Sequence, residues 1–250
     1  MILIFTLLSF LITQSVQANA IQEFERPLVQ VFVPVGYDED DSVNIIVEAR
    51  LHNRCETVGT ATSIVDEDLK KIEVGVTVFR HPGDSTKCPD FKNPLSIYRT
   101  FHLGTIHTPE TYDIVDASSQ KHLGHLVVEK VIDVSMGRDN RVYLPLRDAY
   151  LRKADKPDLQ GNRWELVLEG VAAKGEFCPG SIDPRYQNNV IVILPGVAEN
   201  SPTCPIGSPE AFSLSLRLDD SKVPYEPFLL HVRTFGGESI NKIITPALYK

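Results

Sequence analysis

The chain has 250 residues and a formal net charge of -8, with 33 acidic against 25 basic residues. Binding to nucleic-acid phosphates or to an anionic membrane surface relies on clustered lysines and arginines. The acidic balance therefore disfavours both kinds of partner, and we expect no nucleic-acid ligand. The length is enough for one large domain or two ordinary ones.

Residues 1–20 have the pattern of a secretory signal peptide. An apolar run of eleven residues, Ile2 to Ile12, precedes polar residues and the small residues Ala18 and Ala20, as in an Ala-x-Ala cleavage site. We predict cleavage after Ala20, with cleavage after Ala18 as the alternative. A membrane anchor is the other interpretation, but spanning a bilayer core takes about 20 apolar residues. We therefore expect an exported protein, periplasmic or extracellular, with no membrane span after cleavage.

Alternation of apolar and polar residues predicts β-strands along the rest of the first half. In residues 71–80, apolar Ile72, Val74 and Val76 alternate with Glu73 and Gly75. By this and similar patterns, strands are expected at 31–35, 43–51, 72–78, 97–103 and 126–134. The stretch 63–71 is a candidate for two helical turns instead.

The second half also predicts strands, at 142–146, 164–171, 190–194, 212–218 and 228–234. The run from Val190 to Leu194 reads VIVIL and has no polar side. Such a run favours a strand that is covered on both faces or lies in the middle of a sheet. Residues 146–155 are a candidate for three helical turns.

Landmarks recur between the halves in the same order, which indicates an internal duplication. Cys-Pro followed by a second proline occurs at Cys88 and at Cys204, 116 residues apart. VFVPV at 31–35 resembles VYLPL at 142–146, and Glu48 aligns with Glu169 if about ten residues are inserted in the second copy. The repeat predicts domains at 21–136 and 137–250.

Many short strands separated by proline, glycine and Asx turns predict an all-β protein. Together with the repeat, they favour two tandem β-sandwich domains with an immunoglobulin-like layout. A single larger all-β domain is the alternative.

All four cysteines follow the leader, and an even number in an exported chain predicts disulfides. The duplication favours pairing within each half, Cys55 with Cys88 and Cys178 with Cys204, among three pairings in total. Each bridge would join the end of a strand to a loop near one end of a sandwich.

An acidic run follows the first predicted strand, at Asp38, Glu39, Asp40 and Asp41. Clustered carboxylates bind calcium, so these four residues are weak candidate calcium ligands. The spacing lacks the EF-hand alternation, and a solvated turn is the simpler interpretation. We expect no metal and no cofactor.

Six of the seven histidines lie in the first half. His122 and His125 are three residues apart, and a regular strand places such residues on opposite faces unless Gly124 marks a bulge. Zinc would need two or three further ligands. We interpret the histidines as scattered surface or edge residues.

The sequence carries no Gly-x-Ser-x-Gly, Ser-x-x-Lys, His-Glu-x-x-His or phosphate-cradling glycine loop. We assign no catalytic residue and expect an exported, noncatalytic two-domain protein with a binding, adhesion or envelope-structural role. Its expected ligand is a protein or a glycan.

Two alternatives stay open. One is an exported hydrolase with its site between the domains or in the second-half insertion; a deep interdomain cleft with converging histidines and carboxylates would favour it. The other is a periplasmic assembly chaperone, because the chain resembles pilus chaperones in layout, with two immunoglobulin-like domains in a similar length.

Overall fold

The computed structural model describes residues 21–82, 87–130, 143–172, 179–197 and 210–249. Apart from two short 3-10 segments, η1 (Phe235–Gly237) and η2 (Pro246–Tyr249), the regular structure in these ranges is β-strand. The prediction of an all-β protein is therefore confirmed. Within the same ranges, no helix has the length and apolar character needed to span a membrane. The predicted leader 1–20 and the polar stretch 133–140 lie outside the described residues.

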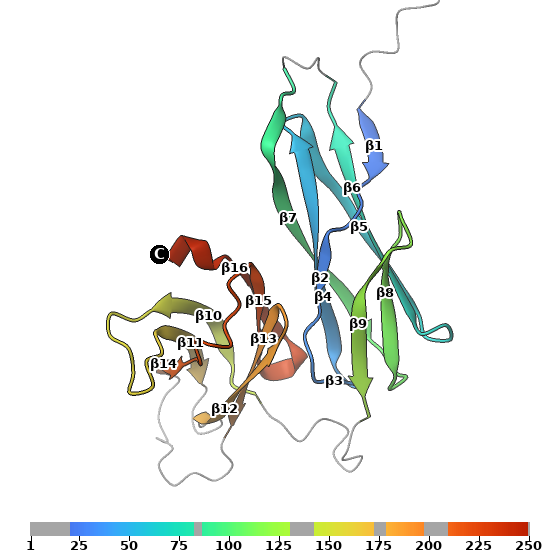
Figure 1. Ribbon diagram of the computed structural model, residues 1–250. Coiled ribbons are helices and arrows are strands. Elements are labelled where there is room, and N and C mark those ends of the chain that lie inside the picture. The colour runs from blue at the N-terminus through green and yellow to red at the C-terminus, as the bar shows by residue number, and fades with distance from the viewer. Residues whose placement is uncertain (1–20, 83–86, 131–142, 173–178, 198–209, 250) are drawn as a thin grey trace, which may run out of the picture.

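The first half forms two sheets, seen as the blue-to-green part of Figure 1. The smaller sheet has the order β2-β4-β7, and the larger has the path β1-β6-β8-β9-β3 with β5 paired to β6. The strands are β1 (Gln22–Glu25), β2 (Gln30–Phe32), β3 (Tyr37–Asp38), β4 (Ser42–Asn53), β5 (Glu56–Asp66), β6 (Lys71–Arg80), β7 (Asp90–Thr105), β8 (Thr111–Asp116) and β9 (His122–Glu129).

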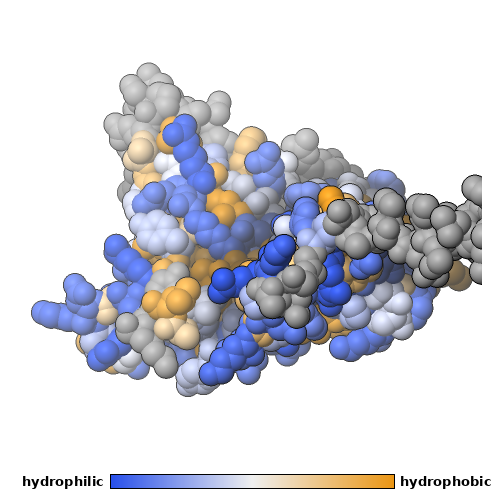
Figure 2. All heavy atoms as spheres, turned by 90° about the horizontal axis from the view of Figure 1, so that it is seen from above, coloured by the Kyte–Doolittle hydropathy of each residue, from blue (hydrophilic) through white to orange (hydrophobic). Residues whose placement is uncertain are grey.

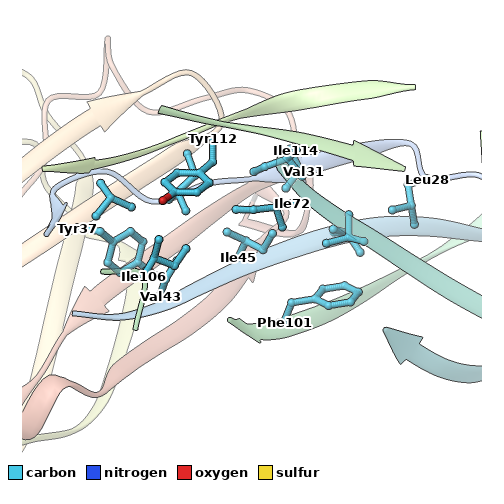
Figure 3. Close-up of a cluster of buried hydrophobic side chains, with 14 of the residues drawn as sticks. Leu28, Val31, Tyr37, Val43, Ile45, Ile72, Phe101, Ile106, Tyr112 and Ile114 are labelled. Carbon is cyan, nitrogen blue, oxygen red and sulfur yellow. The ribbon is translucent and has the colours of Figure 1, made fainter. Parts of the chain in front are cut away.

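A hydrophobic core fills the space between these two sheets (Figure 3). Val43, Ile45 and Val47 project from β4 of the smaller sheet, and Ile72 and Ile114 project from β6 and β8 of the larger one. These positions are alternate residues of their strands, which point to the same face of a sheet. The alternation noted in 71–80 thus marks the core-facing side of β6.

The second half also forms two sheets, with the orders β10-β11-β14 and β12-β13-β15-β16. A second core lies between them and includes Leu166 and Leu168 of β11 and Ile191 and Ile193 of β13. The strands are β10 (Leu146–Lys153), β11 (Trp164–Ala172), β12 (Pro179–Gln187), β13 (Val190–Val197), β14 (Glu210–Arg217), β15 (Phe228–Arg233) and β16 (Ser239–Ile244).

Both helical alternatives are wrong. Residues 63–71 form the end of β5, a turn and the start of β6, and Lys70 in the turn has a left-handed φ of 53°. Residues 146–153 form β10, in which Ala149 and Leu151 are buried and Arg152 is exposed to solvent. Pairing with β6 and β11 satisfies the backbone of these segments, so tertiary context overrides weak helical periodicity.

A third apolar cluster lies between the two halves. The molecule therefore has four sheets with an apolar layer in each half and another between the halves. In Figure 1, β2 and β4 of the first half lie beside β13 and β15 of the second. Figure 2 shows that hydrophilic side chains cover much of the face seen from above, with hydrophobic side chains in smaller areas.

Candidate functional site at the joint between the halves

The joint is the set of contacts that the second-half sheet β12-β13-β15-β16 makes with the first half, chiefly with sheet β2-β4-β7 and with β3 and its flanking residues. Its apolar part is a cluster to which both halves contribute fully buried side chains. Phe32 and Ile46 come from the first half, and Val192 and Leu229 come from the second. This cluster explains why VIVIL has no polar side: Ile191 and Ile193 face the core of the second half, while Val192 faces the first half. The prediction of a strand covered on both faces is confirmed.

Arg233, at the end of β15, makes a charged contact and a hydrogen bond that cross the joint. Its Nη1 donates to Asp41 Oδ2 at 2.8 Å, and its Nη2 donates to the carbonyl of Gly36. The guanidinium carbon also lies 4.9 Å from the ring centre of Tyr37. Only 5% of the Arg233 side chain is exposed. Because a buried cation needs a counter-charge and satisfied donors, Asp41 and the Gly36 carbonyl fix where Arg233 lies.

Tyr37 and His231 meet edge to face across the joint, with ring centres 5.8 Å apart. The Tyr37 hydroxyl donates to the Asn44 carbonyl at 2.9 Å and accepts from the Asn44 N–H at 3.2 Å. His231 is fully buried, and its Nδ1 lies 2.7 Å from Asn241 Oδ1. Burial lowers the pKa of His231 to about 4 and raises that of the Tyr37 phenol above its ordinary value. Both rings are therefore neutral at pH 7.

A small pocket opens beside these groups, with Ser42, Glu238 and Ser239 among the residues that line it. It has room for about one water molecule. Ser239 Oγ accepts from Asn44 Nδ2 at 3.3 Å and from Asn241 Nδ2 at 3.0 Å. The pocket thus gathers two serines, a histidine and two carboxylates. Of these groups, Ser239 and Asp41 form hydrogen bonds that hold the halves together.

The acidic run forms a tight turn after β3. The Asp38 N–H donates to Asp41 Oδ2 at 2.9 Å, and the Asp40 N–H donates to Asp38 Oδ1 at 3.0 Å. The Glu39 N–H donates to the carbonyl of Glu129 in β9 at 3.1 Å. Among the four weak candidate calcium ligands, the carboxylates of Asp38 and Asp41 accept backbone hydrogen bonds within this turn. The Asp41 carboxylate also binds Arg233. Sequence reasoning grouped these residues by charge and missed this contact across the joint.

Cys55 and Cys88 form a disulfide that joins the β4–β5 turn to the segment before β7. The predicted pairing and its place at a strand exit are confirmed for the first half. Cys178 and Cys204 lie outside the described residues. Glu56, the residue after Cys55, has a buried carboxylate that binds Arg26 and Arg80, each at 2.7 Å. Burial opposes ionisation of Glu56, but the His52 N–H and the two arginines hold its pKa below the ordinary value.

One sequence pattern could have indicated the polar residues of the joint. His231 and Arg233 occupy alternate positions of an otherwise apolar strand, FLLHVR, whose residues are all buried. Such a pattern indicates that the strand's second face is buried and polar. It does not identify the partner, because Asp41 and Tyr37 lie almost 200 residues away in the chain.

Comparison of the chain with protein-family models, with curated proteins and with solved structures finds no match. We therefore infer function from this chain's own residues and geometry.

Proposed function

We propose that this chain is an exported, noncatalytic protein of two tandem immunoglobulin-like β-sandwich domains, with a role in binding, adhesion or envelope structure. The domain limits are 21–136 and 137–250, after removal of the signal peptide 1–20. The ligand is a protein or a glycan, and the compartment is periplasmic or extracellular.

The order of strand pairing supports the duplication. In the first half, β2, β4 and β7 pair antiparallel in that order, as β10, β11 and β14 do in the second. The chain from β5 to β6, β8 and β9 pairs antiparallel, parallel and antiparallel. The chain from β12 to β13, β15 and β16 follows the same sequence. A shared ancestor of the two halves accounts for both the pairing and the spacing of the cysteines.

The filled joint is the observation that carries the functional proposal. A hydrolase with its site between domains keeps a cleft large enough for substrate, lined by groups that are available for chemistry. In the described part of the joint, apolar side chains pack together, and the pocket beside His231 has room for about one water molecule. A fixed orientation of the halves instead favours binding, because a preorganised surface loses less conformational freedom when a partner docks.

The experiment is affinity capture with the mature chain from the compartment in which it accumulates. We expect one partner to be captured saturably by the native chain and by Asp40→Ala, and more weakly by Asp41→Ala, which loosens the joint. The chain recovered there should begin at Ile21, or at Asn19 for the alternative cleavage. The same preparations are assayed against ester, peptide and glycoside substrates.

Four results would overturn the proposal. The first is turnover that is lost in His231→Gln, which would establish the hydrolase. The second is capture only of assembly subunits that the chain later releases, which would establish a chaperone. The third is the absence of a saturable partner, and the fourth is an unprocessed chain that stays inside the cell.

A further inference from the structure

Two histidines and an aspartate come together on the solvent-facing side of the larger first-half sheet. Asp113 lies on β8, and His122 and His125 lie on β9, which pairs antiparallel with β8. Among the described residues, these three form the one group of metal-binding side chains whose donor atoms all lie within 4.8 Å of one another. In the sequence, this group is far from the second-half joint residues His231 and Arg233.

A bulge brings the two histidines to the same face. Ile114 pairs with Gly124 but Val115 pairs with His122, so Leu123 is an extra residue in β9. Leu123 packs against the core, and a Cβ on Gly124 would lie 3.1 Å from Val31 Cγ1. Two successive residues therefore point inward, and the residues on either side of them both point outward. In a regular strand, residues three apart would lie on opposite faces.

The donor atoms already lie near the spacing of a metal site. Asp113 Oδ1 is 2.8 Å from His125 Nδ1 and 3.7 Å from His122 Nε2. In a tetrahedral zinc site, bonds of 2.0–2.1 Å place neighbouring donors about 3.3 Å apart. Between 49% and 60% of each side chain is exposed, so small rotations about its side-chain bonds suffice to close around an ion.

The neighbouring lysine, Lys71, does not compete with a metal ion for the Asp113 carboxylate. Lys71 is paired with Asp113 across β6 and β8, but its Nζ bonds Glu73 Oε1 at 2.6 Å and Gln120 Oε1 at 2.9 Å. The Asp113 carboxylate thus faces the two imidazoles. Two imidazoles and one carboxylate suit zinc, copper(II) and nickel more than calcium or magnesium, which prefer oxygen ligands.

We propose that Asp113, His122 and His125 bind one divalent transition-metal ion, with zinc as the physiological choice. The three side chains supply three ligands, and water completes the shell on the exposed side. The open position gives a partner's carboxylate or imidazole a place to coordinate. The site is separate from the joint and stands whether or not the proposed binding role is correct.

The test is calorimetric titration of the chelator-treated mature chain with zinc sulfate. We expect one zinc ion per chain, and a copper(II) spectrum in electron paramagnetic resonance with coupling to two imidazole nitrogens. His122→Ala, His125→Ala and Asp113→Ala should each lower the affinity at least about tenfold, because even the loss of an outer partner costs 10–100-fold. His52→Ala and His107→Ala, which remove other exposed histidines, should leave the affinity unchanged.

A relocation variant separates geometry from histidine content. His125→Ala combined with Val127→His keeps the number of histidines and moves one of them two residues along the same face, about 7 Å away. It should bind zinc no better than His125→Ala. Melting curves without metal identify variants that fail to fold. Saturable binding that survives His122→Ala/His125→Ala, or an absence of saturable binding to the native chain, would overturn the proposal.

Discussion

His231 has an environment that its neighbours in sequence do not reveal. It is fully buried beside Asn241, with the Arg233 cation nearby, and burial lowers its pKa from 6.5 to about 4. The unfolded chain therefore binds a proton at a pH where the folded chain does not. By linkage, its contribution to stability is complete above pH 6.5 and is lost as the pH falls toward 4.

We expect His231 to account for a loss of up to about 3 kcal/mol in the free energy of unfolding between pH 7 and pH 4. Urea unfolding of the native chain and of His231→Gln measures this loss as a difference between the two proteins. Carboxylates such as Glu56 also titrate in acid, but they do so in both proteins and cancel. A stability difference that is equal at pH 7 and pH 4 would contradict the prediction.

At the scale of elements, the Cys55–Cys88 bridge joins two connections at one end of the first half. The bridged residues are 33 apart in the chain, with Cα atoms 5.2 Å apart. Backbone bonds run beside it, from the Arg54 N–H to the Pro89 carbonyl and from the His81 N–H to the Cys55 carbonyl. The bridge therefore holds the β4–β5 turn against the segments that flank the β6–β7 connection.

Removing this bridge in Cys55→Ser/Cys88→Ser should lower the free energy of unfolding by about 3 to 4 kcal/mol, because the unfolded chain regains the entropy of an open loop of this length. Denaturant unfolding of the double variant measures the change without disturbing Cys178 and Cys204. A loss below about 1 kcal/mol would show that the bridge contributes little beyond the surrounding backbone bonds.

At the scale of the whole molecule, the Asp41–Arg233 pair joins the two halves across the joint. Asp41→Ala leaves the guanidinium buried without the Asp41 carboxylate, which we expect to cost about 3–5 kcal/mol. The matched control is Asp40→Ala in the same turn, which removes an exposed carboxylate and should change stability by less than about 0.5 kcal/mol.

The double variant Asp41→Ala/Arg233→Met removes the charge as well as its partner, so it should recover part of the stability that Asp41→Ala loses. Equilibrium denaturation of all four proteins gives the comparison. Equal stabilities of Asp40→Ala and Asp41→Ala would mean that the pair does not stabilise the joint.

The all-β class and most strand positions are predictable from the sequence, and its apparent repeat favours the Cys55–Cys88 pairing that the structure shows. These follow from local patterns, such as the alternation in β6 and the Cys-Pro element at Cys88. Three features could be read only from the folded chain: Arg233 binds Asp41, the first half covers β13, and a bulge at Leu123 places His122 and His125 on the same face as Asp113. Partner and register depend on which strands pair, and that choice is set by burial of distant apolar faces.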